Sequence, residues 1–126
     1  MHTILLVEDE VLLREGVQEM LEAHDYKVIG AGDGIEALDW LEQVPVSLII
    51  TDLIMPNMDG IEFVEKVRVK YPDLPIVVIS GSPGSVMHRL GISDIQVPGA
   101  TASIMKPFRS ADLLTLVQRV LAGGSE

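Results

Sequence analysis

The sequence predicts an α/β fold: a doubly wound five-stranded parallel sheet with helices on both faces. Short apolar runs alternate with segments of helical periodicity along all 126 residues. The runs are unbroken, as in residues 4–7 and 76–79, which indicates strands that are buried on both faces. A chain of this length suffices for one domain with one core. We therefore expect one domain over residues 1–122 and a short C-terminal tail over residues 123–126.

The first half of the chain predicts three strands separated by two helices. Three apolar runs predict the strands, over residues 4–7, 26–31 and 46–51. Between them, apolar residues recur at helical spacing, which predicts helices over residues 11–23 and 34–44. Each strand is thus followed by a helix, as parallel pairing requires.

The second half continues the alternation with one irregular stretch. Helices are expected over residues 60–71 and 110–122, and strands over residues 76–80 and 102–105. Ser110 is a good N-cap for the last helix, and Gly123-Gly124 end it. Residues 82–100 contain three glycines and two prolines, so we expect a short or irregular fourth helix near residues 85–90.

Composition excludes several classes of function. Nine basic and 19 acidic side chains give a net charge of −10, which opposes binding to nucleic acid or to an anionic membrane surface. No apolar run approaches the roughly 18 residues of a membrane span, and the N-terminus does not resemble a signal peptide. The chain has no cysteine, so disulfides and thiolate metal sites are excluded. The expected location is the cytoplasm.

Reactive polar side chains follow four of the predicted strands. Glu8 and Asp9 follow the first, and Asp52, Ser80 and Lys106 follow the third, fourth and fifth. The carboxyl ends of parallel strands lie along one edge of a sheet, where such folds bind ligands. Carboxylate oxygens are the ligands that Mg²⁺ prefers. The pattern predicts a Mg²⁺ site beside an acceptor for a phosphoryl group.

Each of these residues also has a simpler interpretation. Glu8 and Asp9 would serve equally well as helix caps. Ser80 alone would be a strand-ending turn, and Lys106 alone a surface charge. Asp52 is the most informative, because a rigid strand holds its carboxylate, which can attack phosphorus to form an acyl phosphate. Asp59-Gly60 we interpret only as a turn and a helix start.

Together these motifs closely resemble the receiver domain of two-component response regulators. The resemblance spans essentially the whole chain and rests on residues 6–10 (Leu-Val-Glu-Asp-Glu), 51–60 (Thr-Asp-Leu-Ile-Met-Pro-Asn-Met-Asp-Gly), 80–81 (Ser-Gly) and 106–108 (Lys-Pro-Phe). It implies a flavodoxin-like sheet with strand order 2-1-3-4-5. It also implies that a histidine kinase or a phosphotransfer protein donates the phosphoryl group.

By position, the resemblance implies a role for each site residue. Asp52 corresponds to the phosphoacceptor and Asp9 to a direct Mg²⁺ ligand, while Glu8 helps to hold the metal through water. The backbone carbonyl of Ile54 would be another ligand. Ser80 corresponds to the switch hydroxyl and Lys106 to the lysine that pairs with the phosphoryl group, with a cis peptide bond to the following proline.

Two departures concern the output of such a switch. The family usually has Tyr or Phe three residues before the lysine, and this chain has Ser103. Residues 82–102 also lack the usual regular fourth helix. Because partner binding is expected to change through residues 82–103, the downstream partner and the oligomeric state stay open. The chain ends after the fifth helix, so we expect a stand-alone receiver or one excised from a larger protein.

The leading hypothesis is therefore a phosphoacceptor signalling switch rather than an enzyme. The first alternative is a receiver-like protein-binding module that phosphorylation does not switch, and Ser103 motivates it. The second is a small Mg²⁺-dependent phosphatase with Asp52 as its nucleophile. Such enzymes usually have a second acid two residues after the nucleophile, where this chain has the apolar Ile54.

Overall fold

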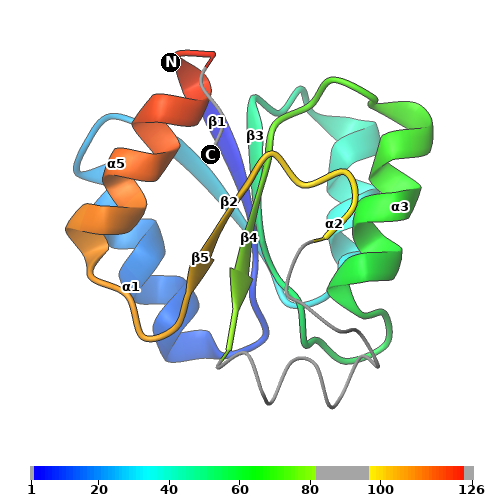
Figure 1. Cartoon of the computed structure of the whole chain (residues 1–126), viewed down its shortest axis with the longest axis horizontal. Coiled ribbons are helices and arrows are strands. Elements are labelled where there is room, and N and C mark those ends of the chain that lie inside the picture. The colour runs from blue at the N-terminus through cyan, green and yellow to red at the C-terminus, as the bar shows by residue number, and fades with distance from the viewer. Residues whose placement is uncertain (1, 82–96, 124–126) are drawn as a thin grey trace.

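A five-stranded parallel sheet forms the centre of the computed structural model, which describes residues 2–81 and 97–123 (Figure 1). The strands are β1 (Thr3–Val7), β2 (Lys27–Ala31), β3 (Leu48–Asp52), β4 (Ile76–Ser80) and β5 (Ala102–Met105). Their order across the sheet is β2-β1-β3-β4-β5, and every neighbouring pair is parallel. The predicted fold class and strand order are confirmed.

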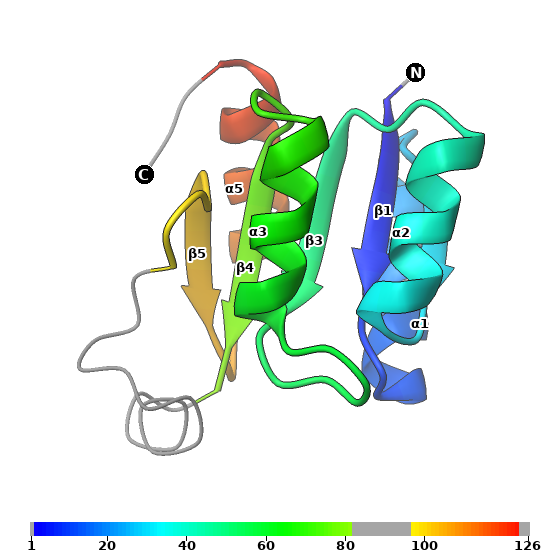
Figure 2. The ribbon, with the colours of Figure 1, turned by 90° about the vertical axis from the view of Figure 1, so that its right-hand side faces the viewer.

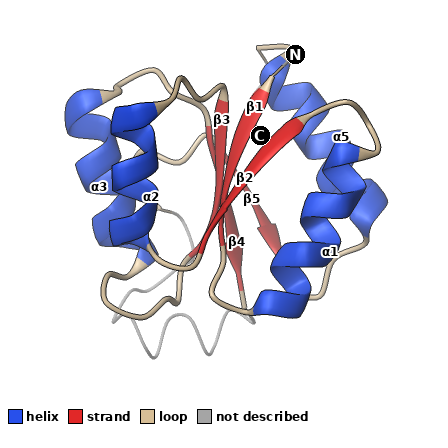
Figure 3. Cartoon of the chain, turned by 180° about the vertical axis from the view of Figure 1, so that it is seen from behind, coloured by secondary structure: helices blue, strands red, loops and turns tan. Residues whose placement is uncertain are grey.

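Helices cover both faces of this sheet. Helices α1 (Val11–Glu22) and α5 (Ser110–Leu121) lie on one face, and α2 (Gly34–Gln43) and α3 (Gly60–Lys70) lie on the other (Figures 1 and 3). The fourth helix predicted near residues 85–90 falls outside the described residues. Within the described ranges, no helix is long and apolar enough to cross a membrane.

The two-layered cover explains the unbroken apolar runs. Ile4 and Leu6 of β1 belong to the core under α1 and α5, whereas Leu5 and Val7 belong to the core under α2 and α3. All four side chains are buried. Successive side chains of a strand point to opposite faces, so a strand that is covered on both sides needs apolar residues at every position. Burying each such side chain contributes roughly 1.5–3 kcal/mol.

The helix starts follow local chemistry, with one correction. Asp33 and Asp59 are the N-caps of α2 and α3, and each side chain accepts a hydrogen bond of 2.9 Å from the backbone N–H three residues later. The N-cap of α5 is Arg109, so the prediction of Ser110 was wrong by one residue. The reason is that the Arg109 carbonyl already accepts hydrogen bonds from the N–H groups of Asp112 and Leu113, which makes Ser110 the first helical residue.

The parallel arrangement brings the loops that follow the strands to one edge. In Figure 2 the arrowheads of β1, β3, β4 and β5 point the same way, and the chain leaves each strand at the same end of the molecule. The connections from β1 to α1 and from β3 to α3 therefore lie next to each other. This edge carries the polar residues singled out in the sequence.

Candidate functional site

Three carboxylates gather at the carboxyl edge of the sheet. Glu8, Asp9 and Asp52 each offer an oxygen, and these oxygens lie within 4.8 Å of one another. Glu8 is 1% exposed and Asp52 5%, whereas Asp9 is exposed to solvent. Glu8 and Asp9 follow β1 and Asp52 ends β3, its neighbour in the sheet. The cluster therefore opens to solvent on the Asp9 side.

The two carboxylate oxygens of Asp52 have different partners. Oδ1 accepts hydrogen bonds from the backbone N–H groups of Leu53, at 2.7 Å, and Ile54, at 3.3 Å. Oδ2 accepts a hydrogen bond from Lys106 Nζ at 2.9 Å. The backbone thus fixes the plane of the carboxylate through one oxygen, and within the described part of the chain the other oxygen is bonded to the Lys106 ammonium.

Lys106 provides positive charge to both buried acids. Its Nζ lies 2.9 Å from Asp52 Oδ2 and 3.4 Å from Glu8 Oε1. Burial alone would lower the pKa of Lys106, but the hydrogen bond and the charge of Asp52, followed by those of Glu8, outweigh it and raise the pKa. The ammonium is therefore charged at neutral pH.

The environment of Glu8 disfavours ionisation of its carboxyl group. Burial, which disfavours the ionised form, is the main reason that its pKa is raised to about 7, and the charge of Asp52 adds to the effect. The N–H of Glu10, which donates to Glu8 Oε2 at 3.0 Å, and the charge of Lys106 act in the opposite direction. Glu8 Oε1 is buried and makes no hydrogen bond with any described residue.

This donor set fits a divalent cation. Mg²⁺ takes oxygen ligands, usually from one or two carboxylates and several waters. Glu8, Asp9 and Asp52 provide three such oxygens within 4.8 Å, and the cluster is open to solvent beside Asp9. Glu8 Oε1 is buried and accepts no hydrogen bond from the described residues. The capping alternative for the first two acids is not supported, because the N-cap of α1 is Glu10.

Ser80 and Lys106 are joined through their backbones. The Lys106 N–H donates to the Ser80 carbonyl at 2.7 Å where β4 and β5 end. Ser80 is 1% exposed, and its Oγ makes no hydrogen bond within the described part of the chain. The Lys106–Pro107 peptide bond is cis, as the resemblance implied. A buried hydroxyl with no hydrogen-bond partner among residues 2–81 and 97–123 thus lies at the end of the strand next to β3.

Gly60 is a site residue that we had interpreted only as a turn and a helix start. Its N–H donates to the Leu53 carbonyl at 2.7 Å. A Cβ at this position would lie 2.6 Å from the Asp52 carbonyl oxygen and 2.6 Å from Leu53 Cα. Only glycine allows this close approach of α3 to the backbone that carries Asp52. The Asp59-Gly60 pair was visible in the sequence, but the sequence did not show that Gly60 packs against the backbone of residues 52 and 53.

Asn57 closes the same loop against α2. Its Nδ2 donates to Asp33 Oδ2 at 2.9 Å, and its own φ of 69° lies in the left-handed region, which asparagine tolerates. Asp33 thus binds the loop with one oxygen and caps α2 with the other. Sequence spacing gave no sign of this contact, which joins residues 24 positions apart.

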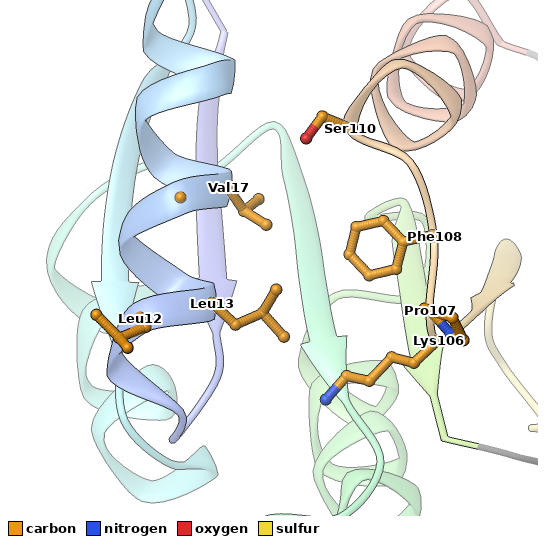
Figure 4. A pocket seen from close by; sticks show the side chains of 8 residues that line it. Leu12, Leu13, Val17, Lys106, Pro107, Phe108 and Ser110 are labelled. Atoms are coloured by element: carbon orange, nitrogen blue, oxygen red, sulfur yellow. The ribbon is translucent and has the colours of Figure 1, made fainter.

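An apolar groove of about 540 Å³ lies beside the acidic cluster, between α1 and the segment that follows β5. Figure 4 shows Leu12, Leu13 and Val17 on one side, with Pro107 and Phe108 on the other. The Lys106 side chain extends along its end. Leu12 is 81% exposed, so a large apolar side chain faces solvent next to the site.

Comparisons with known proteins agree on one family. The profile of the response regulator receiver domain matches residues 4–118. The chain is 33% identical to the response regulator receiver protein CpdR of Brucella abortus, over 96% of this chain and 98% of that protein. It is 31% identical to the sensor kinase CckA of the same organism, over 94% of this chain but 12% of CckA. The crystal structure of the chemotaxis response regulator CheY4 of Vibrio cholerae superposes with a TM-score of 0.79 at 32% identity, over 95% and 98% of the two chains.

Proposed function

The chain belongs to the family of response regulator receiver domains, and from this we propose that it is a Mg²⁺-dependent phosphoacceptor switch. Receiver domains are phosphoacceptor signalling modules of two-component systems, and they act with histidine kinases. In our proposal, Asp52 takes the phosphoryl group from a histidine kinase or a phosphotransfer protein. The observation that carries the proposal is the position of the Asp52 carboxylate, 2.9 Å from Lys106 Nζ and clustered with two other acids.

The cation would be held by the residues of the cluster. Asp9 and Asp52 would bind it directly, Glu8 through water, and the backbone carbonyl of Ile54 would complete the protein ligands. When bound, Mg²⁺ neutralises part of the negative charge that otherwise repels an incoming phosphoryl group. Glu8 Oε1 supports this assignment, because it is buried, has no hydrogen-bond partner among the described residues, and has Lys106 Nζ at the longer distance of 3.4 Å. A buried carboxylate oxygen that is only partly compensated is costly, and a bound cation would reduce that cost.

The transfer follows from the two environments of the Asp52 carboxylate. Oδ1 stays hydrogen-bonded to the backbone, so Oδ2 is the attacking atom. A bond forms between Oδ2 and phosphorus while the bond between phosphorus and the donor histidine nitrogen breaks, and the imidazole keeps that electron pair. Lys106 Nζ then compensates the charge on the phosphoryl oxygens. Ser80 Oγ, which has no hydrogen-bond partner among the described residues, would donate to another.

The groove gives the donor a place to dock. It is apolar, it adjoins Lys106, and exposed Leu12 lies on its rim. An amphipathic helix that carries the donor histidine would bury these side chains and present the histidine to Asp52. A histidine kinase draws the phosphoryl group from ATP, so the proposal includes a cytoplasmic location. The added charge of roughly −2 then shifts the balance between two loop arrangements and changes partner binding through residues 82–103.

We expect the phosphorylated protein to be long-lived. Ile54 lies two residues after the acceptor, and its side chain has no group that can activate water. Hydrolysis of the acyl phosphate should therefore be slow, and a lifetime of only seconds, followed by loss of the phosphoryl adduct, would contradict this expectation.

Phosphorylation by a small donor tests the proposal directly. The protein is incubated with acetyl phosphate and Mg²⁺, and its intact mass is measured. We expect the addition of one phosphoryl group to the wild type and none to Asp52→Asn. Wild type that gains no group, or the variant that still gains one, would show that the assignment of Asp52 is wrong.

A protein-binding module that phosphorylation does not switch is the second candidate, and Ser103 in place of the usual aromatic favours it. Partner affinity with and without beryllium fluoride, a mimic of the phosphoryl group, separates the two functions. A change of tenfold or more supports the switch, and an unchanged affinity supports the unswitched module.

A further inference from the structure

We propose that Arg14 is a positioning residue that holds the turn between β1 and α1, and with it the metal-binding acids. The proposal rests on the Mg²⁺ site of the proposed function and adds a residue outside the acidic cluster. Arg14 is in the first turn of α1, and its Nη1 donates a hydrogen bond of 2.6 Å to the backbone carbonyl oxygen of Glu8.

This contact fixes the peptide group that joins the two acids. The Glu8 N–H already donates to the Ala31 carbonyl at 2.9 Å, and the Glu8 carboxylate accepts from the N–H of Glu10. The carbonyl oxygen belongs to the peptide plane shared by Glu8 and Asp9. Because this plane is rigid, a hydrogen bond to the carbonyl also sets the direction in which Asp9 leaves the strand.

The path of the Arg14 side chain explains a glycine of β2. A Cβ at Gly30 would lie 3.3 Å from Arg14 Cδ and 3.4 Å from Arg14 Nε. At Gly32, just after the strand, a Cβ would lie 3.8 Å from Arg14 Nη1. Glycine inside a strand weakens it and often marks close approach of another group. Gly30 therefore leaves room for the arginine stem to cross the edge strand and reach Glu8.

Charge and position predict opposite effects when Arg14 loses its guanidinium. Arg14 is a cation near three acids, so by charge alone its removal would strengthen Mg²⁺ binding. If Arg14 orients the turn, its removal weakens binding, and outer residues that orient metal ligands typically contribute 10–100-fold in affinity. The sign of the change thus distinguishes the two roles.

The experiment compares Mg²⁺ affinity among four proteins by following backbone amide signals during titration. We expect Arg14→Met to bind Mg²⁺ at least tenfold more weakly than the wild type, and Arg14→Lys, which keeps a charged donor group, to recover part of the loss. Lys66→Met is the matched control, because it removes one exposed positive charge on α3. Affinity of Arg14→Met that equals or exceeds that of the wild type would overturn the proposal.

A second measurement needs no metal. In metal-free protein we expect the N–H of Glu10 to exchange with solvent at least tenfold faster in Arg14→Met, while the amides of β3 keep their protection. Equal loss of protection in β3 would mean that Arg14 stabilises the fold generally, and no change at Glu10 would mean that it does not hold the turn. If the wild type binds no Mg²⁺, the proposed function fails, and the Glu10 exchange alone decides the role of Arg14.

Discussion

The acidic residues of the site suit cation binding, and their burial costs the folded state free energy. The acids cluster at one edge, and burial raises the pKa of Glu8 to about 7, which means that folding opposes its ionisation. Lys106 compensates part of this cost through contacts with both buried acids. Apolar side chains of similar volume would stabilise the fold at least as well as these buried charges. A cation-binding site, in contrast, requires the carboxylates.

Gly60 provides a sharp test at the residue scale. Gly60→Ala should lower the free energy of unfolding by about 2 kcal/mol or more, because the new methyl group meets backbone atoms at 2.6 Å and backbone cannot move aside cheaply. Urea denaturation followed by circular dichroism measures the change. The displaced loop should also slow phosphorylation of Asp52 by acetyl phosphate.

Gly34→Ala is the matched control for Gly60→Ala. Gly34 is also the first residue of its helix, but the nearest atoms to its Cβ would be side-chain atoms, Met58 Sδ at 3.0 Å and Phe63 Cδ1 at 3.3 Å, and not backbone. We expect a change within about 1 kcal/mol, since alanine favours the helix and the methionine can shift. Equal losses in the two variants would contradict the argument from backbone contact.

The site residues divide into those that the sequence could reveal and those that it could not. Glu8, Asp9 and Asp52 were predictable together because each lies at the end of a buried strand, and parallel strands end at one edge. Arg14 and Gly60 act through contacts with backbone that only the folded chain brings near. No local pattern marked Arg14, and the Asp59-Gly60 pair indicated a turn but not the backbone that Gly60 contacts.

At the scale of elements, α2 and the loop after β3 depend on one aspartate. Asp33 Oδ1 caps α2 by accepting from the Glu36 N–H, and Oδ2 accepts from Asn57 Nδ2. The hydrogen bond from the Glu36 N–H, followed by the one from Asn57, lowers the pKa of Asp33. A single side chain therefore joins a helix start to the loop that follows Asp52.

Asp33→Ala should lower the free energy of unfolding by about 1 kcal/mol at pH 7, the usual contribution of an N-cap. Asp33→Asn should lose less, because asparagine caps equally well. Since the folded pKa is lowered, the stabilisation by the ionised Asp33 is present above its unfolded value of about 3.9 and is lost as pH falls through the folded pKa. Urea titrations of wild type and Asp33→Asn should therefore converge in acid, and a gap that widens there would contradict this.

The elements themselves followed closely from the sequence. All five strands and four of the helices lie where the apolar runs and helical spacing predicted them, with ends that differ by at most two residues. Such ends depend on individual caps, as the shift from Ser110 to Arg109 illustrates. These predictions were accurate because the sheet is buried on both faces. Such strands must be apolar at every position, and an unbroken apolar run is visible in the sequence.

At the scale of the whole molecule, the net charge of −10 and the acidic edge act in the same direction. Like charges repel throughout the folded chain, and three carboxylates lie within 4.8 Å at this edge. A cation that binds this edge joins the loop after β1 to the end of β3, and no unfolded chain offers the same cluster. Binding should therefore stabilise the entire fold.

Thermal and urea unfolding with and without Mg²⁺ test this coupling. Mg²⁺ at ten times its dissociation constant should raise the free energy of unfolding by about 1.4 kcal/mol, because it binds only the folded state. Any salt screens the self-repulsion of so acidic a protein, so the reference is choline chloride at equal ionic strength. Asp9→Asn removes an exposed ligand without disturbing the core. In this variant Mg²⁺ should raise the free energy of unfolding no more than choline chloride does, because only the screening of charge remains. Equal stabilisation by both salts in the wild type would show that the acidic edge does not bind the cation.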